Sequence, residues 1–85
     1  AVTVSVVIPT LDEAPGIAAL VATLLRDGVE VVVVDGGSRD GTPELAREAG
    51  ARVLATARGR ARQLRCGSEH ASGDWIVFLH ADSRL

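Results

Sequence analysis

A run of four valines that ends in a carboxylate and two glycines constrains the fold of this chain more than any other feature. Residues 31–34 are all valine, and Asp35, Gly36 and Gly37 follow directly. Branching at Cβ stiffens the side chain and suits a pleated surface, so the run predicts a strand. The run lacks apolar and polar alternation, which is typical of a strand buried on both faces at the centre of a parallel sheet. Asp35 then lies at the carboxyl end of a central strand, where open α/β sheets bind ligands.

The rest of the chain alternates between strand and helix patterns. We expect Pro9 to end the first strand, Asp12 and Thr42 to cap helices, and Gly28 to end the first helix. Gly67 interrupts the third helix at a cost of about 1 kcal/mol relative to alanine. Strands are expected at residues 2–8, 30–34, 51–55 and 75–79, and helices at about 13–27, 43–49 and 60–71. The last strand is apolar throughout and is expected to be buried. The order β-α-β-α-β-α-β predicts an α/β fold, a parallel sheet with right-handed crossovers and helices on both faces.

Composition limits the class of protein. The chain has 85 residues, which is enough for one domain or part of one. Nine basic and eleven acidic residues give a net charge of -2, which argues against a nucleic-acid-binding module. Cys66 is the single cysteine, so no internal disulfide forms, and a reducing compartment is expected. No apolar run approaches the roughly 18 residues of a membrane span. We therefore expect a cytoplasmic protein, free or at the inner face of the membrane.

Three turns are expected to meet at the carboxyl edge of the sheet, at residues 10–13, 35–40 and 80–82. Carboxylates beside glycines and helix N-termini suit a divalent metal that bridges phosphates. Asp82 is the best candidate for the metal ligand, although an aspartate just after a strand also serves as a turn or helix-capping residue. Asp12 and Glu13 are candidates for either helix capping or ligand binding.

Two nucleotide-binding signatures are absent. The first strand leads into Pro-Thr-Leu-Asp-Glu, and the glycines after the second strand do not have the G-x-G-x-x-G spacing. A Walker loop is absent as well. The sequence therefore supports neither an NAD-dependent enzyme nor a P-loop NTPase.

Four stretches, at residues 6–13, 33–42, 59–63 and 73–82, carry a family resemblance. They occur in the order in which they occur in family-2 glycosyltransferases of the GT-A fold, and the chain resembles the N-terminal, nucleotide-binding half of that Rossmann-like fold. It is most similar to a small bacterial branch with His-Ala-Asp at the metal motif, whose members are often labelled arsenosugar-biosynthesis glycosyltransferases.

The resemblance implies a nucleotide-sugar donor, with either UDP or GDP as the nucleotide, and a divalent cation, Mg²⁺ or Mn²⁺. It implies that Asp82 holds the cation against the diphosphate, and that His80 binds the metal, hydrogen-bonds the ribose or is satisfied by backbone. The arginines 58, 60 and 62 lie where the family's chain passes the donor, and they are alternatively a solvated helix face. The residues that the resemblance assigns to the donor are Pro9, Thr10, Glu13, Asp35, Gly36, Arg58, Arg62 and Ala81.

This chain departs from the family pattern at three positions. Gly36 replaces a second aspartate that reads the base, so uracil recognition stays open. His80 replaces the first aspartate of the Asp-x-Asp motif, and Arg65 replaces an asparagine. Cys66 and His70 belong to no motif and are interpreted as structural.

Residues 1–85 are expected to be the donor-binding part of an incomplete domain. In the family, the second half supplies the acceptor site and the general base, so the catalytic residue lies outside this chain and the acceptor is unknown. Two alternatives remain. One is an assembly module that forms a homo-oligomer through an exposed sheet edge. The other is a nucleotidyltransferase, which ranks last because residues 10–16 are acidic where that class has a basic, Gly-rich loop.

Overall fold

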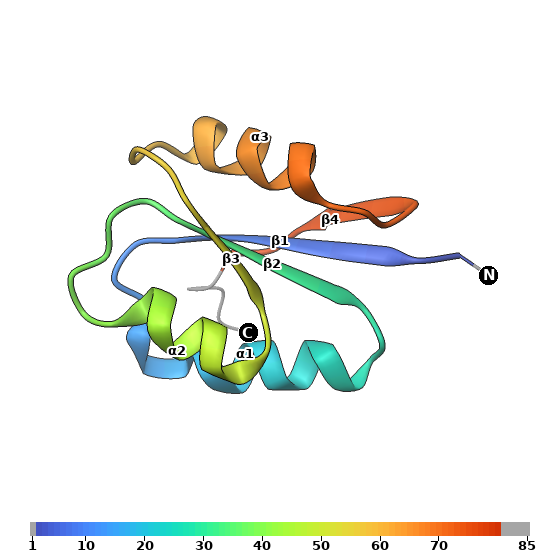
Figure 1. Ribbon diagram of the computed structural model, residues 1–85, viewed down its shortest axis with the longest axis horizontal. Coiled ribbons are helices and arrows are strands. Elements are labelled where there is room, and N and C mark those ends of the chain that lie inside the picture. Colours follow the sequence, from blue (N-terminus) through green and yellow to red (C-terminus); the bar gives the residue numbers. More distant parts are fainter. Residues whose placement is uncertain (1, 81–85) are drawn as a thin grey trace.

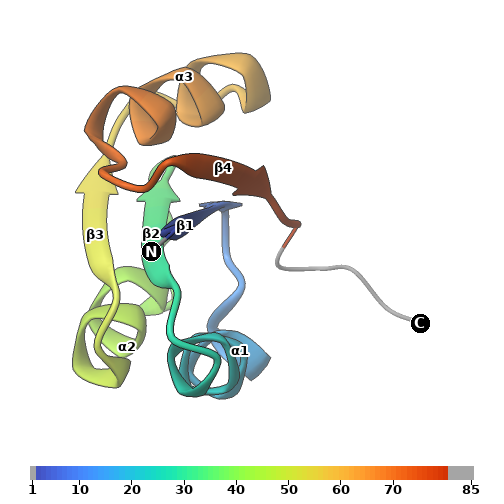
Figure 2. The ribbon, with the colours of Figure 1, turned by 90° about the vertical axis from the view of Figure 1, so that its right-hand side faces the viewer.

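The structure, a computed structural model, describes residues 2–80. Four parallel strands form one sheet in the order β3-β2-β1-β4. Helices α1 and α2 lie below the sheet and α3 lies above it (Figures 1 and 2). The predicted α/β fold is thereby confirmed. The elements are β1 (Val4–Thr10), α1 (Ala14–Arg26), β2 (Glu30–Asp35), α2 (Thr42–Ala49), β3 (Arg52–Ala55), α3 (Arg60–His70) and β4 (Trp75–Phe78).

The valine run forms the centre of the core. Its four side chains are at most 2% exposed, so the prediction of a strand buried on both faces is confirmed. Alternate strand residues point to opposite faces. Val31 and Val33 therefore pack on the α1 and α2 side, while Val32 and Val34 pack beneath α3.

The first strand does not end at Pro9, as predicted, but continues to Thr10, and it begins at Val4 rather than residue 2. Pro9 is the register partner of Val34 in β2. Along a strand, the backbone N–H and C=O groups of successive residues point alternately to the strand on one side and to the strand on the other. The carbonyl of Val7 points to the β4 side, where it accepts a hydrogen bond from the N–H of Leu79. Pro9 faces that same side, beyond the end of the β1–β4 pairing, so its missing N–H removes no hydrogen bond from the sheet.

The fourth strand is exposed, which contradicts the expectation that it is buried. Its exposed fractions are 65% for Trp75, 38% for Ile76, 48% for Val77 and 52% for Phe78. β4 is the edge strand beside β1, and in Figure 2 it extends out from beneath α3. An apolar run predicts burial only where other elements cover both faces, and within residues 2–80 the helices cover β1 and β2 instead.

The glycines after α1 and α2 agree with the predictions, and α3 begins at Arg60 as predicted, whereas the N-caps of α1 and α2 differ from the predicted residues. Gly28 and Gly50 follow α1 and α2 with φ of 78° and 110°, as expected for glycines after a last turn. Gly41, rather than Thr42, is the N-cap of α2. Asp12 does not cap α1, because the N-cap is Glu13 and it makes no side-chain cap hydrogen bond. No helix in residues 2–80 is long and apolar enough to cross a membrane.

Candidate functional site

The strand ends of β1 and β2 form the base of the candidate site. Thr10 and Asp35 are register partners at the carboxyl edge. The Thr10 hydroxyl donates to Asp35 Oδ1 at 2.8 Å, and the N–H of Gly36 donates to the Thr10 carbonyl at 3.0 Å. Both residues are buried, with exposures of 2% and 4%. The two strands are therefore joined by side chain and backbone at the point where their loops diverge.

Asp35 organises the turn that follows β2. Its Oδ2 accepts from the N–H groups of Gly37 at 3.0 Å and Ser38 at 2.7 Å, and its Oδ1 also accepts from the Ser38 hydroxyl at 2.5 Å. Burial by itself would raise the pKa of Asp35, but the hydrogen bonds from Ser38, Thr10 and Gly37 lower it below its usual value. The lowered pKa favours the carboxylate form of Asp35, and its two oxygens each accept two hydrogen bonds from the protein.

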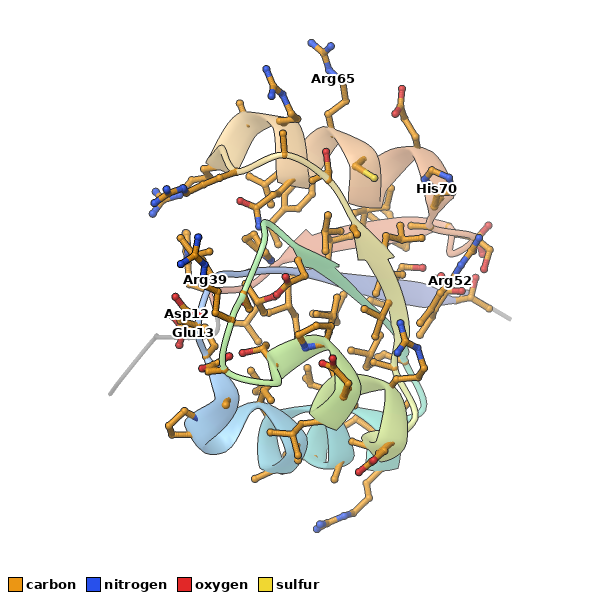
Figure 3. The ribbon with its side chains drawn as sticks, turned by 60° about the vertical axis from the view of Figure 1, so that its left-hand side comes forward. Asp12, Glu13, Arg39, Arg52, Arg65 and His70 are labelled. Carbon is orange, nitrogen blue, oxygen red and sulfur yellow. The ribbon has the colours of Figure 1, made fainter. Side chains whose placement is uncertain are left out.

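The loop after β1 is hydrogen-bonded to the loop after β2. Asp12, at φ 55°, donates its N–H to the Ser38 hydroxyl at 2.7 Å and accepts from the N–H of Arg39 at 2.8 Å. The N–H of Glu13 donates to the Thr42 hydroxyl at 2.9 Å. Figure 3 shows Asp12, Glu13 and Arg39 on the same side of the molecule. Asp12 therefore joins the two loops, a role that the capping prediction missed.

Asp40 supplies the helix capping that was assigned to Asp12 and Thr42. Its Oδ2 accepts from the N–H of Ala14 at the start of α1 at 3.0 Å, and its Oδ1 accepts from the N–H of Thr42 at 3.1 Å. The hydrogen bond from the Thr42 hydroxyl is the largest cause of a pKa below the usual value for Asp40. One carboxylate thus satisfies first-turn N–H groups of both helices, which lie on the same face of the sheet.

Gln63 is a buried site residue to which the sequence gave no role. Its Nε2 donates to the carbonyls of Thr10 at 3.0 Å and Val34 at 2.9 Å, and its Oε1 accepts from the N–H of Gly59 at 3.2 Å. Gln63 is 4% exposed. The available signal was its spacing from Gly67, since residues four apart lie on one helix face.

Gly67 allows α3 to approach the sheet closely. A Cβ at this position would lie 2.3 Å from Val7 Cγ1 in β1. Gly67 lowers the helix propensity of α3, but the close packing of the helix against β1 requires a residue without a side chain at this position. Its place on the face that carries Gln63 brings both residues against the strands.

Two neighbouring pockets open beside the joined loops. The smaller, about 180 Å³, lies between the loop after β1 and the start of α3. The larger, about 450 Å³, is lined by residues of the arginine-rich segment, Arg58, Gly59, Arg60, Ala61, Arg62 and Arg65. The smaller is lined by Pro9, Thr10, Leu11 and Glu13 on one side and by Arg58, Gly59, Arg60 and Gln63 on the other.

The pockets bring together most of the predicted donor residues. Pro9, Thr10, Glu13 and Arg58 share the smaller pocket, and Arg62 lines the larger. No acidic residue lies in the first turn of α3 or lines the larger pocket, so its arginines and the helix N-terminus suit an anion there. Asp35 and Gly36 line neither pocket, but Asp35 accepts a hydrogen bond from Thr10 and Gly36 lies against Gln63, and both of these partners line the smaller pocket.

The predicted metal ligands are only partly within the structure. Ala81 and Asp82 lie outside the described residues. His80 is half-buried just after β4. Within residues 2–80, no three histidine, cysteine, aspartate or glutamate side chains are grouped to hold a metal ion. The described residues therefore do not form a metal site by themselves.

Arg65, Cys66 and His70 lie on α3. Arg65 lines the larger pocket and projects away from the sheet (Figure 3). His70 Nδ1 is 2.9 Å from the Cys66 carbonyl, one turn earlier in the helix. This contact within the helix agrees with a structural interpretation of His70.

The sequence matches one family model over nearly its whole length. Residues 5–85 match the model described as glycosyl transferase family 2. The chain is 37% identical over 82 residues to the glycosyltransferase AglJ of Haloferax volcanii. It is 34% identical over 93 residues to the undecaprenyl-phosphate 4-deoxy-4-formamido-L-arabinose transferase of Aeromonas hydrophila. These alignments cover 93% of this chain but only 27% and 28% of the relatives, so the chain spans less than a third of their length.

Solved structures share the fold. Glucosyl-3-phosphoglycerate synthase from Mycobacterium tuberculosis, crystallised with Mn²⁺, UDP and glucosyl-3-phosphoglycerate, has a TM-score of 0.82 at 33% identity. The match covers 95% of this chain and 34% of that one. Mannosyl-3-phosphoglycerate synthase from Rubrobacter xylanophilus has a TM-score of 0.85 at 25% identity, covering 99% of this chain and 32% of that one.

Proposed function

The chain belongs to glycosyl transferase family 2 and has the N-terminal α/β half of the GT-A fold, and from that premise we propose that it is the donor-binding part of a nucleotide-sugar-dependent glycosyltransferase. The observation that carries the proposal is the smaller pocket. It lies at the carboxyl edge of the sheet and combines the loop after β1 with the arginine-rich start of α3. Ligands of open α/β sheets bind at that edge.

In this proposal, the smaller pocket binds the nucleoside of the donor and the larger pocket binds its sugar end. Pro9, Thr10 and Glu13 border the nucleoside in the smaller pocket, with Asp35 and Gly36 next to two of its lining residues. Arg58 and Arg60 line both pockets, so they lie where a diphosphate would pass from one to the other. Arginine pairs with phosphate oxygens bidentately. Arg62 and the larger pocket then accommodate the sugar end of the diphosphate.

We assign metal binding to the segment that follows β4. Asp82 supplies the carboxylate, Ala81 borders the donor, and His80 contributes an imidazole to the metal or to the ribose. Carboxylate and phosphate oxygens are ligands that Mg²⁺ and Mn²⁺ accept. Related structures were crystallised with Mn²⁺ or Mg²⁺ and UDP. When bound, such a cation offsets the charge of the leaving diphosphate.

The chain's own residues bind and orient the donor, and a carboxylate elsewhere in the protein deprotonates the acceptor hydroxyl. Asp35 and Asp40 are fully engaged in loop hydrogen bonds, so they are poor candidates for the general base. Residues 1–85 alone are therefore expected to bind a donor without transferring its sugar. The acceptor is bound by the part of the protein that these residues lack.

The finer assignments follow from single observations. UDP is favoured over GDP because a relative that shares 33% identity was crystallised with UDP. His-Ala-Asp at residues 80–82 favours the arsenosugar-type branch. The single cysteine favours the cytoplasm, either free or at the inner face of the membrane.

Calorimetric titration tests the proposal. UDP, GDP and UDP-glucose are titrated into the complete protein with and without Mn²⁺, and Asp82→Asn and Arg58→Gln are compared with the wild type. We expect UDP binding that strengthens with Mn²⁺, loss of the Mn²⁺ effect in Asp82→Asn, and at least about a tenfold weaker affinity in Arg58→Gln. Glu48→Gln, an exposed change on α2, is the control. A folded protein that binds no nucleotide would refute the donor site.

The exposed β4 favours a second candidate, an assembly module. Four consecutive apolar residues, 75–78, are exposed at a sheet edge whose backbone groups have no further strand partner among residues 2–80. Such an edge pairs readily with another copy. Sedimentation separates the candidates. A dimer that dissociates on Val77→Lys, without nucleotide binding by the wild type, would favour assembly, whereas a monomer that binds UDP would favour the donor site.

A further inference from the structure

Gln63 is held in one orientation by the backbone around it. Two carbonyls, of Thr10 and Val34, face Nε2, and the N–H of Gly59 faces Oε1. Both amide protons are used, and exchanging the amide nitrogen and oxygen would place an acceptor against two acceptors. One side chain therefore joins the ends of β1 and β2 to the residue that precedes α3.

Gln63 occupies the space into which a side chain at position 36 would extend. A Cβ at Gly36 would lie 2.9 Å from Gln63 Oε1 and 3.0 Å from its Cδ. Gly36 does not have a positive φ, whereas its neighbour Gly37 has a φ of 105°. The backbone at position 36 does not require glycine, so the constraint is the amide of Gln63.

Gln63 also spans the smaller pocket. It lines the pocket itself, and its hydrogen-bond partners Thr10 and Gly59 line opposite sides of it. The separation of the two walls is therefore fixed by a buried side chain between them. A change at Gln63 alters the depth of the pocket and the spacing of its walls together.

We propose that Gln63, packed against Gly36, is the positioning residue that sets the shape of the base end of the donor pocket and thereby determines which nucleotide base is accepted. This inference rests on the proposed donor site. With Gln63 in place the smaller pocket has a volume of about 180 Å³ and excludes a purine. Shortening Gln63 opens the space over Gly36 and admits the larger base.

The packing part of the proposal is tested by a double-mutant cycle on the complete protein. Gly36→Ala adds only the Cβ that would meet Gln63, and Gln63→Ala removes the atoms that it would meet. Each single change is expected to lower the folding equilibrium constant. We expect Gly36→Ala to lower the folding equilibrium constant by a factor at least about fivefold smaller in the Gln63→Ala background than in the wild type. The effects of substitutions at two contacting residues are not additive. If the effects of the two substitutions on the folding equilibrium constant are additive, the proposed contact between Gln63 and position 36 is wrong.

The selectivity part is tested by the ratio of the UDP and GDP dissociation constants. Partial unfolding weakens both nucleotides by the same factor, so a merely structural role leaves the ratio unchanged. Gln63→Ala is expected to shift the ratio towards GDP by at least about tenfold, the scale on which pocket size discriminates. Gln63→Met is the matched control, because it fills similar space without the hydrogen bonds. It should weaken both nucleotides and leave the ratio within about twofold.

The outcomes separate this inference from the proposed function. If the wild type binds UDP and the ratio is the same in Gln63→Ala, the inference fails and the donor site stands. If the folded wild type binds no nucleotide, both fail. A shifted ratio in Gln63→Ala together with an unshifted ratio in Gln63→Met supports the inference.

Discussion

Strands β2 and β4 are both short, continuous apolar runs, yet β2 is buried and β4 is exposed. The valines of β2 are at most 2% exposed, whereas residues of β4 are 38–65% exposed. β2 has a strand on each side and helices on both faces, while among residues 2–80 β4 has one strand partner, β1. The difference teaches that the neighbours of a strand, rather than its composition, decide how much each side chain contributes to stability.

The largest effect is expected from a charge in the central strand. Val33→Asp places a carboxylate where the native side chain is 0% exposed. An unpaired buried charge should destabilise the fold by more than about 4 kcal/mol, so urea unfolding should find the variant largely unfolded. Val77→Asp in β4 is the matched control and should remain folded. If the two variants lose the same stability, the contrast between the strands is wrong.

The next effect is expected where α3 meets the central strands. Gly67→Ala adds a Cβ at 2.3 Å from Val7 Cγ1, and the overpacking should cost about 3 kcal/mol despite the better helix propensity of alanine. Thermal unfolding measures the loss. Glu69→Ala, on the exposed face of the same helix, is the control and should change stability by less than about 0.5 kcal/mol. A stabilised Gly67→Ala variant would contradict the close approach of α3.

A smaller effect is expected at the end of β2. Asp35→Asn replaces an acceptor-only side chain that faces four donor groups, and should cost about 2 kcal/mol. The folded-state pKa of Asp35 lies below its ordinary value of 3.8, so its stabilisation is complete above that value and is lost as the pH falls through the folded-state pKa. Urea unfolding of the wild type against pH should therefore decline more steeply below pH 3.8 than that of Asp35→Asn. Parallel curves would mean that Asp35 does not contribute this dependence.

The smallest effect is expected at the outer edge. Phe78→Ser removes an aromatic side chain that is 52% exposed, and should lower the stability of this chain by about 0.5 kcal/mol or less. Chemical denaturation of the isolated chain gives the value, provided that it is monomeric at the concentration used. A loss comparable to that of a core substitution would indicate that another surface covers β4.

Local patterns predicted the order of the elements, the parallel sheet and the burial of β2, but they did not predict the exposure of β4 or the contacts of Gln63 and Asp12. The valine run and the glycines that follow α1 and α2 are local signals, and the structure agrees with them. The exposure of β4 depends on its place in the sheet, which periodicity does not encode. The buried role of Gln63 and the loop-joining role of Asp12 were missed for the same reason, since their hydrogen-bond partners lie 26–53 residues away in the sequence.

The structure brings some of the predicted donor residues together, and their role in donor binding stays a prediction. Pro9, Thr10, Glu13 and Arg58 line one pocket, as expected for loops at one sheet edge. The prediction that Asp35 lies at the end of the second strand is confirmed. Its four hydrogen bonds were not predicted, because three of them depend on the conformation of the turn at Gly37 and Ser38. Asp82 and Ala81 lie outside the described residues and stay predictions.

The hydrogen bonds between the loop after β1 and the loop after β2 have a consequence for motion. The amides of Asp12, Glu13 and Ala14 are held by Ser38, Thr42 and Asp40, while Asp12 holds the amide of Arg39. Neither loop can open without releasing the other, so the two form a single cooperative opening unit. Amide hydrogen exchange at these positions should follow one common opening free energy. The loop after β1, which borders the smaller pocket, would then move together with the loop after β2.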